Sequence, residues 1–470
     1  MTLEKDRCWL KAILLAIKPG RFNRCDFITG QSYYIYLYFY SARMNRLVIL
    51  LLVLCAFPAA AQLQVNEDRD YSDQIHSAKL YPLGNQTGYP VLTLGGNDKL
   101  ELHFDDMSAR PQNYSYTFQL CNADWTPAQV NVLDFIKGYT QTRITTYRNS
   151  SIALTRYIHY EAQIPDRTMQ PIKSGNYILK VFSNGDTSQL LFTRRFLVVQ
   201  PLASVAATVQ QPFNASMFRT HQKVHFTVNI AGVNASFPNQ QIRVTVLQNN
   251  RWDNAAKNLA PTIVRQHTLE FNTEQQCVFP AGREWRWLDL RSFRLQSDRV
   301  KNAQYLPNAT NITLRPDPER KNLRIAQYSD FNGRYSISTL ESVNPFWQGD
   351  YANVQFSFVP HDLSAYAGQE IRLFGELTQY GNNPNAVMKW NEATGAFETN
   401  LFLKQGYYDY QYVYRSSGDQ GPWNHHLIAG DNWETENTYT ILVYYKPFGA
   451  RHDELIGLTR VNSVAGRTGL

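Results

Sequence analysis

The residue types of a thiol hydrolase occur in this sequence in Cys121, His159 and one of Asp105 or Asp106. In such an enzyme a thiolate attacks the substrate, an imidazole moves the proton and a carboxylate orients the imidazole. Cys121 and His159 both fall within alternating strand patterns, where side chains point into a core or onto a sheet face. No helix N-terminus is evident that would lower the thiol pKa. We therefore predict that the chain is not an enzyme.

Metal-binding and phosphate-binding motifs do not occur in the sequence. His425 and His426 are adjacent, which on a strand sends them to opposite faces, and no Cys-x2-Cys, His-Glu-x2-His or acidic calcium-loop pattern accompanies them. Their segment is rich in turn residues, so we expect solvated loop histidines. No Gly-rich phosphate loop and no G-x-S-x-G turn occurs either. The sequence predicts no metal and no cofactor.

Alternating tyrosines mark one segment near the C-terminus, "YYDYQYVY", in which Tyr408, Tyr410, Tyr412 and Tyr414 share one strand face. Aromatic ladders of this kind stabilise sheets by cross-strand packing. Buried tyrosine hydroxyls need partners, so the same pattern is also typical of a binding surface with a wet rim. The residue types leave both interpretations open.

Period-2 alternation recurs from residue 62 to the end, and no stretch of a dozen residues shows helical periodicity. In "NYSYTFQLCN" the side chains at 114, 116, 118 and 120 fall on one face, as in a half-buried sandwich strand. The turn at Ser174 and Gly175 leads into a strand with an early tyrosine, Tyr177, as at the corner of immunoglobulin-like sandwiches. The predicted fold class is all-β. The expected strands are 100–104, 114–120, 152–164, 176–182, 190–199, 221–230, 240–248, 266–271, 284–293, 310–314, 353–359, 370–377, 397–403, 407–415, 438–445 and 454–460.

Residues 44–61 contain the parts of a secretory signal peptide in their usual order. Arg46 supplies the positive charge, 47–57 is apolar, and Ala59 and Ala61 give the small-x-small cleavage pattern. We predict cleavage between Ala61 and Gln62. The apolar run is shorter than the ~20 residues that a spanning helix needs, so we expect no membrane span.

Two further features of the N-terminal segment affect how it is read. Lipidation at Cys55 is the weaker interpretation, because a lipoprotein signal has a small residue before the cysteine and here the bulky Leu54 precedes it. Residues 1–43 are most simply the product of an upstream start codon that has been called in error. We exclude both segments from fold reasoning.

The charge of the remaining chain argues against nucleic-acid binding. Residues 1–61 hold 8 of the 46 Lys and Arg residues and 3 of the 39 Asp and Glu residues, which leaves a formal net charge of +2. No long run of one sign occurs, whereas a nucleic-acid site concentrates basic residues on one face. Only Cys121 and Cys277 follow the predicted cleavage site, so we expect two free buried thiols. An export signal with few cysteines suits a bacterial periplasm.

Changes in composition divide the chain into three predicted sandwiches in series. The first is 62–201 and ends at Pro201. The second is 202–335 and includes a charged linker at 315–335 with two prolines. The third is 336–470 and holds the alternating tyrosines.

Several sequence blocks follow one another over nearly the whole predicted mature chain. They include "LHFDDM" at 102–107, "YSYTFQLCNADWTPA" at 114–128, "YIHYEAQIP" at 157–165, "SGNYILKVF" at 174–182, "WLDLRSFRLQSDRV" at 287–300, "LKQGYYDYQYVY" at 403–414 and "ETENTYTILVYYKPFGARHDELIGLTRVNS" at 434–463. In their order and spacing, these blocks together resemble the plug protein family of the type IX secretion system of Bacteroidota.

The resemblance implies a non-enzymatic periplasmic protein that binds the periplasmic end of an outer-membrane β-barrel translocon and closes its pore. The implied location is peripheral to the outer membrane, through the translocon. Aromatic residues dominate interface hot spots. The candidate contacts are therefore Trp125, Trp423 and whichever of Tyr408, Tyr410, Tyr412 and Tyr414 are exposed, with Trp125 also suited to capping the first sandwich.

An alternative function is a periplasmic glycan-binding scaffold. The strands and turns of 370–381 and 388–414 follow the order of early-set sandwiches related to starch- and glycogen-binding modules. Sugars stack on an exposed Trp in such modules, and Trp390 is the nearest counterpart here.

Overall fold

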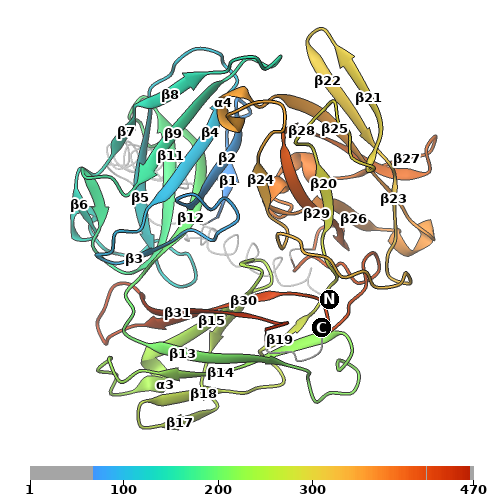
Figure 1. The fold of residues 1–470 in the computed structure, drawn as a ribbon. Coiled ribbons are helices and arrows are strands. Elements are labelled where there is room, and N and C mark those ends of the chain that lie inside the picture. The colour runs from blue at the N-terminus through green and yellow to red at the C-terminus, as the bar shows by residue number, and fades with distance from the viewer. Residues whose placement is uncertain (1–66, 420, 466–470) are drawn as a thin grey trace, which may run out of the picture. The chain divides into compact units, whose positions relative to one another are not determined.

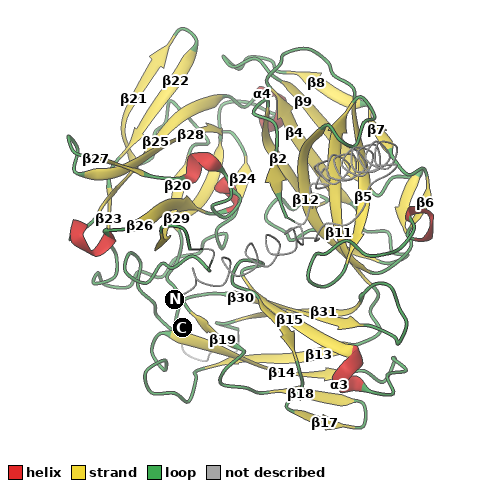
Figure 2. Ribbon diagram, turned by 180° about the vertical axis from the view of Figure 1, so that it is seen from behind, coloured by secondary structure: helices red, strands yellow, loops and turns green. Residues whose placement is uncertain are grey.

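Alternating apolar residues build an all-β structure in the computed structural model, which describes residues 67–419 and 421–465. The described helices are single turns, and strands make up the layers (Figure 2). Three groups of buried apolar side chains each lie between two sheets. The predicted all-β class and the sandwich architecture are confirmed.

The first sandwich is formed by the described residues from 67 to 199. Its larger sheet has the order β1-β12-β11-β5-β7 with β3 parallel to β12, and the second sheet has the order β2-β4-β9-β8. The alternation in β5 puts its tyrosines and Phe118 in the core, as predicted. The Tyr177 hydroxyl donates to the Lys173 carbonyl at 2.8 Å, which is the predicted tyrosine corner. The elements are β1 (Arg69–Asp70), β2 (Ile75–Pro82), β3 (Val91–Thr93), β4 (Leu100–Asp106), β5 (Tyr114–Cys121), η1 (Val132–Asp134), β6 (Ile136–Gly138), β7 (Thr142–Ile144), β8 (Thr146–Asn149), β9 (Ile158–Ile164), β10 (Met169–Pro171), β11 (Gly175–Ser183) and β12 (Leu190–Val199).

The second sandwich combines the middle of the chain with its end. One sheet has the order β13-β14-β18-β17, with β19 also on β14, and the other has the order β16-β15-β30-β31. Figure 1 shows β30 and β31, from the red end of the chain, beside the green strand β15. The elements are β13 (Ser204–Gln210), β14 (His221–Asn229), α3 (Pro238–Gln241), β15 (Ile242–Gln248), β16 (Ala256–Leu259), β17 (Ile263–Arg265), β18 (Thr268–Phe271), β19 (Val278–Pro280), β30 (Thr438–Tyr445) and β31 (Glu454–Asn462).

The third sandwich is inserted between β19 and β30. Strand β29 pairs with β20, β24 and β26 in one sheet, and the other sheet has the order β21-β22-β25-β28-β27 with β23 on β25. The elements are β20 (Arg286–Asp289), β21 (Val300–Leu306), β22 (Ala309–Leu314), β23 (Asp317–Pro318), β24 (Tyr335–Ile337), α4 (Pro345–Gln348), β25 (Tyr351–Val359), η2 (Leu363–Tyr366), β26 (Gln369–Phe374), η3 (Glu376–Thr378), η4 (Pro384–Ala386), β27 (Lys389–Asn391), β28 (Ala396–Lys404) and β29 (Gly406–Ser416).

The boundary predicted at 335/336 is therefore wrong, as is the strictly serial order. Strands β20 to β23 precede the boundary but pair with strands of the third sandwich, and β30 and β31 follow it but complete the second. The insertion begins and ends at one place, because the Asn432 N–H donates to the Gly282 carbonyl at 2.9 Å. Alternation identifies strands, but it does not say which strands pair.

One predicted strand starts later than expected. Strand β9 begins at Ile158, whereas alternation predicted it from 152. Ile152 has a φ of 58°, in the left-handed region that a β-branched residue rarely adopts. The backbone N–H groups of Leu154 and Thr155 donate to the Asp350 carboxylate at 2.9 and 3.0 Å. This segment is a loop bonded to the third sandwich.

Candidate functional site

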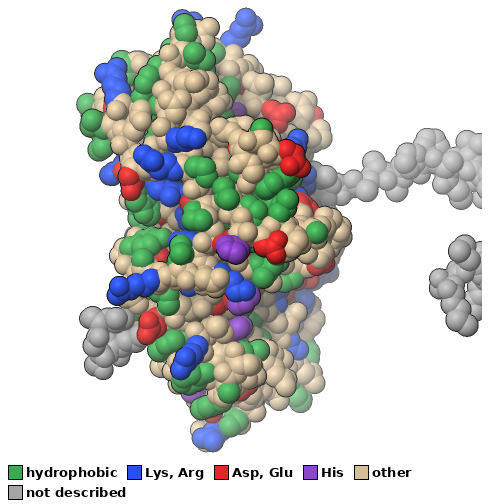
Figure 3. All heavy atoms as spheres, turned by 90° about the vertical axis from the view of Figure 1, so that its right-hand side faces the viewer, with side chains coloured by type: hydrophobic (Ala, Val, Ile, Leu, Met, Phe, Trp, Pro, Cys, Tyr) green, Lys and Arg blue, Asp and Glu red, His purple; other side chains and the backbone are tan. Residues whose placement is uncertain are grey.

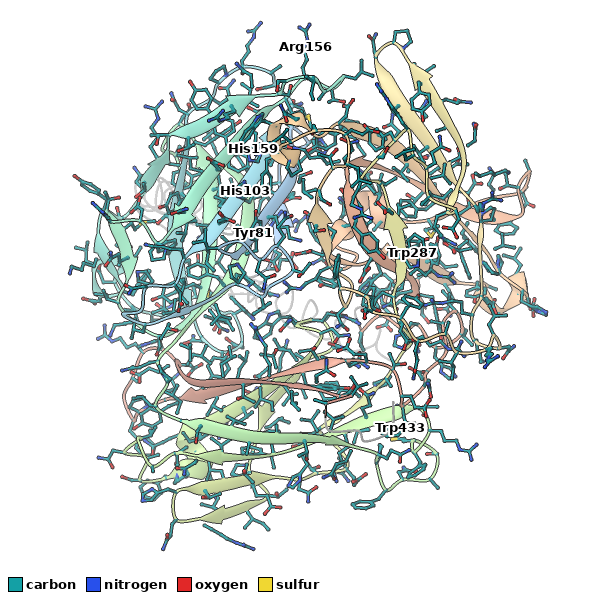
Figure 4. The ribbon with its side chains drawn as sticks, viewed as in Figure 1. Tyr81, His103, Arg156, His159, Trp287 and Trp433 are labelled. Atoms are coloured by element: carbon teal, nitrogen blue, oxygen red, sulfur yellow. The ribbon has the colours of Figure 1, made fainter. Side chains whose placement is uncertain are left out.

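A buried polar cluster lies where the first and third sandwiches meet. Alternation along β4 and β9 turns Phe104 and Tyr160 into the first core and leaves His103, Asp105 and His159 on the opposite face. That face is covered, because the Phe346 ring of α4 stacks on His103 at 4.2 Å. Figure 4 shows Tyr81, His103 and His159 one after another along this sheet.

The two histidines and Asp105 form a hydrogen-bonded chain. The His159 Nδ1 atom lies 2.7 Å from the Asp105 carboxylate, and the His159 Nε2 atom lies 2.9 Å from the His103 Nδ1 atom. A carboxylate only accepts, so His159 donates from Nδ1 to Asp105. Burial, and then the charge of His159, lower the pKa of His103 to about 3. His103 is neutral at physiological pH.

Asp105 is held as a carboxylate by groups from the third sandwich. The Lys404 ammonium forms an ion pair with it, and the Tyr351 hydroxyl donates to it at 2.5 Å. Burial pushes the pKa of Asp105 upward, but Lys404 and His159 outweigh that effect and hold the pKa below its usual value. Lys79 forms a second ion pair across the same junction, with Glu376.

Glu161 adds a further possible ligand beside the two imidazoles. It lies directly across from His103 in the β4–β9 pairing. One carboxylate oxygen of Glu161 and one ring nitrogen from each of His103 and His159 all lie within 4.8 Å of one another. Imidazole nitrogens with a carboxylate oxygen are a zinc-type donor set.

Two cavities lie near this junction. A small one of about 10 Å³ is lined by residues that include His103, His159 and Phe346, and it has room for about one water molecule. A larger one of about 570 Å³ is lined by residues of all three sandwiches. Four charged groups on its wall form two ion pairs, Arg194 with Asp70 and Lys79 with Glu376.

The structure does not assemble the thiol hydrolase that the residue types allowed. Cys121 lies on β5, in the other sheet from His159, and its hydrogen-bond contacts are with Gln119. Burial raises the pKa of Cys121 to about 11, so the thiolate that such chemistry needs is disfavoured. Cys277 is likewise a buried free thiol.

The tyrosine stripe belongs to the third core, which corrects its use as an interface. Tyr408, Tyr410 and Tyr412 are each 2% exposed or less, and Tyr414 is half-buried. The hydroxyls of Tyr410 and Tyr412 both donate to Asp317 at 2.8 Å, and the Tyr408 hydroxyl donates to the Lys404 carbonyl. The core interpretation is correct, because the buried Asp317 carboxylate supplies the hydrogen-bond partner that the Tyr410 and Tyr412 hydroxyls need.

The two tryptophan candidates for the interface are also covered. Trp125 is 2% exposed and meets Trp252 edge to face at 4.9 Å, where the first and second sandwiches share a group of buried apolar side chains. Trp423 is half-buried, with the Arg415 guanidinium 3.9 Å from the centre of its ring. Trp125 is therefore a packing residue.

Trp390 does not present the open platform on which a sugar would stack. Its ring is half-buried and packs against Phe397 at 5.0 Å, at the margin of the third core. The Trp390 Nε1 atom is buried with no hydrogen-bond partner within the described chain. Packing within the sandwich explains this residue.

His425 and His426 lie in a loop, as expected, but their rings are bonded to a carboxylate and are not simply solvated. Both rings reach the Asp431 carboxylate, from Nε2 at 2.9 Å and from Nδ1 at 2.7 Å. The Gly282 N–H donates to the same carboxylate, so this group fastens the loop where the third sandwich joins the second. The predicted cleavage site at Ala61 and Gln62 lies outside the described residues.

His103 and Glu161 were missed in the sequence, although a signal was present. In β4 and β9 the polar positions alternate as His103 and Asp105, and as His159 and Glu161. Four residues of metal-binding types on one face of two strands indicate a cluster only if the strands pair in this register. That register is visible only in the structure.

A family model for the type IX secretion system plug protein 1st domain matches residues 75–200, which is the first sandwich from β2 to the end of β12. The chain belongs to the type IX secretion system plug protein family. A crystal structure of a hypothetical protein from Parabacteroides merdae ATCC 43184 is similar over 85% of this chain and 100% of its own, with 30% identity and a TM-score of 0.80. No curated protein matches the chain.

Family membership connects the protein with type IX secretion and indicates an envelope location. The family is one of secretion-system plug domains, and it is not a known enzyme family. In residues 67–419 and 421–465, no helix is long and apolar enough to cross a membrane.

Proposed function

We propose that this protein is a periplasmic plug, which binds the periplasmic end of the outer-membrane β-barrel translocon of the type IX secretion system and closes its pore. The observation that carries the proposal is the family match over the first sandwich. Association with the translocon would hold the protein peripherally at the outer membrane. The plug acts by occupying space and needs no catalysis.

A plug must resist deformation, and contacts between the sandwiches support that role. The Lys404–Asp105 and Lys79–Glu376 ion pairs join the first and third sandwiches. The Arg334 guanidinium adds hydrogen bonds to backbone carbonyls of the first sandwich. Buried polar groups tolerate little displacement, because losing a partner leaves a desolvated group unpaired.

The first and second sandwiches are joined in a similar way. The Trp252 indole donates to the Tyr89 hydroxyl at 2.6 Å, and the Tyr444 hydroxyl donates to Asn176 at 2.8 Å. These residues surround the edge-to-face contact of Trp125 and Trp252. The joints are specific hydrogen bonds within apolar packing, which favours one relative arrangement of the sandwiches.

The test is co-purification with the translocon. Affinity-tagged translocon from cells in which secretion is idle should recover the chain, and deletion of its gene should increase the permeability of the outer membrane to large hydrophilic probes. The proposal is wrong if the translocon recovers no plug and permeability is unchanged. Measurable polysaccharide affinity that is lost in Trp390→Ala would instead support the glycan-binding scaffold.

A further inference from the structure

We propose that His103, His159 and Glu161 bind one zinc ion at the junction of the first and third sandwiches. The ligand atoms would be the His103 Nδ1, the His159 Nε2 and a carboxylate oxygen of Glu161. The inference stands on the geometry of the cluster and does not depend on the plug function.

The pairing of β4 with β9 brings the three side chains together. His103 lies opposite Glu161, His159 is two residues before Glu161 on the same strand face, and the two ring nitrogens are 2.9 Å apart. Zinc bonds of about 2.0–2.2 Å in tetrahedral geometry hold ligand atoms roughly 3.3–3.6 Å apart. The three ligand atoms already lie within 4.8 Å of one another, so small side-chain shifts would bring them to these distances.

Asp105 orients one ligand as zinc sites commonly require. It accepts from the His159 Nδ1 atom at 2.7 Å, while the Nε2 atom of the same ring lies 2.9 Å from the His103 Nδ1 atom. A carboxylate behind a metal-binding histidine fixes its tautomer and makes it a stronger ligand. Lys404 in turn fixes Asp105. Zinc would take the His103 Nδ1 lone pair in the tautomer that is protonated on Nε2, in place of the hydrogen bond between the two rings.

Two polar groups beside the imidazoles, one partly exposed and one buried, have no protein partner among the described residues. The Glu161 carboxylate makes no hydrogen bond or ion pair with any described residue, whereas Asp105 and Glu376 each have a lysine. The Tyr81 hydroxyl is buried with no hydrogen-bond partner among the described residues, and its ring stacks on His103 at 5.5 Å.

The two imidazoles are shielded from bulk water, while Glu161 is partly exposed, and there is room for an ion. Phe346 stacks on both imidazoles, at 4.2 and 5.3 Å between ring centres. The adjoining cavity of about 10 Å³ holds one water-sized group, which suits the fourth coordination position. Oxygen-preferring ions such as Mg²⁺ are disfavoured by the two nitrogen ligands.

The test is metal binding by the purified full chain after chelation. We expect one Zn²⁺ per chain by elemental mass spectrometry and calorimetry, no comparable binding of Mg²⁺, and a tetrahedral Co²⁺ absorption spectrum. Glu161→Gln should weaken Zn²⁺ binding by at least about tenfold without preventing folding, because the side chain is partly exposed and has no partner. His103→Ala should abolish it, and Asp105→Asn should weaken it roughly 10- to 100-fold.

Glu101→Gln is the matched control, since Glu101 is on the same strand and face as His103 but its carboxylate accepts from the Gly84 N–H at 3.1 Å. It should bind Zn²⁺ like the unaltered chain. The proposal is overturned if the unaltered chain takes up no zinc. It is equally overturned if Glu161→Gln, shown to be folded by circular dichroism, binds as tightly as the Glu101→Gln control. Either result would leave the two histidines as a hydrogen-bonded relay that only packs the junction.

Discussion

At the scale of single residues, the Lys404–Asp105 ion pair has the largest expected effect on stability. Both side chains are 1% exposed. Removing one member of a buried pair leaves the other charge desolvated, which costs about 3–5 kcal/mol. Lys404→Met should therefore lower the free energy of unfolding by about 3 kcal/mol or more in urea titrations followed by tryptophan fluorescence. Lys137→Met, at an exposed site on β6, should change it by less than about 0.5 kcal/mol.

The buried carboxyl of Asp409 is expected to give the protein an unusual dependence of stability on pH. Burial, and then the charge of Asp330, raise the pKa of Asp409 to about 8, from 3.8 in the unfolded chain. The folded state binds the extra proton, so this stability is present below about pH 4 and is lost as the pH rises toward 8. The side chain of Asp409→Asn stays neutral at every pH. Between pH 5 and pH 9 its free energy of unfolding should therefore rise relative to that of the unaltered protein by roughly 1–3 kcal/mol.

Thermal melts across this pH range would test the prediction for Asp409. Glu392→Gln is the control, because Glu392 is exposed and replacing it should not change how the melting temperature depends on pH. An Asp409→Asn melting temperature that runs parallel to that of the unaltered protein at every pH would contradict the assignment of a protonated Asp409.

Residue types alone could not decide which aromatic side chains face solvent. The alternation of Tyr408, Tyr410 and Tyr412 correctly placed them on one face of a strand. Whether that face was core or surface depended on Asp317, about ninety residues earlier, which accepts two of the hydroxyls. The same limit applies to His103 and Glu161, which become neighbours only through strand pairing.

At the scale of elements, strands were well predicted and their partners were not. Alternation located β5, β11, β12, β29 and β30 to within a few residues, because one face of each strand is apolar. Strand β30 pairs with β15, about two hundred residues earlier in the chain. Nothing in the pattern of either strand encodes so distant a partner, so the inserted third sandwich was missed.

The insertion predicts which fragments fold. A fragment of residues 283–431 contains every strand of the third sandwich, and its ends lie together at the Gly282–Asn432 hydrogen bond. We propose that it folds independently. A fragment of 336–470 lacks β20 and β22 and carries β30 and β31 without β15, so it leaves two apolar faces uncovered.

Circular dichroism melts and limited proteolysis of the two fragments distinguish these boundaries. The 283–431 fragment should melt cooperatively and resist protease, whereas the 336–470 fragment should aggregate or be digested. A cooperative melt from 336–470, with none from 283–431, would support the serial boundaries that the sequence suggested.

At the scale of the whole molecule, charge offers little long-range attraction to a partner. The formal net charge after residue 61 is +2, and Figure 3 shows basic and acidic side chains interspersed over one face. Steering by charge requires a concentrated field of one sign. The predicted aromatic anchors are buried, or half-buried in the case of Tyr414 and Trp423. The proposed association with a translocon would therefore depend mainly on other exposed side chains.

Ile152 and Val343 are the exposed apolar residues that we expect to matter most for this association. They are 76% and 98% exposed, on loops of the first and third sandwiches that are joined by the hydrogen bond from the Ser151 N–H to the Trp347 carbonyl. Burying one such side chain contributes about 1.5–3 kcal/mol. The double variant Ile152→Ser/Val343→Ser should therefore bind the translocon at least about tenfold more weakly in titrations with the purified translocon.

Leu295→Ser is the control for that double variant, because it removes a similarly exposed apolar side chain from another loop, and it should bind normally. Raising the salt concentration should weaken association by less than about tenfold, since few charges need to be paired. Dissociation in moderate salt, together with unchanged binding by the double variant, would show that charged groups hold the plug and that these two loops face away from its partner.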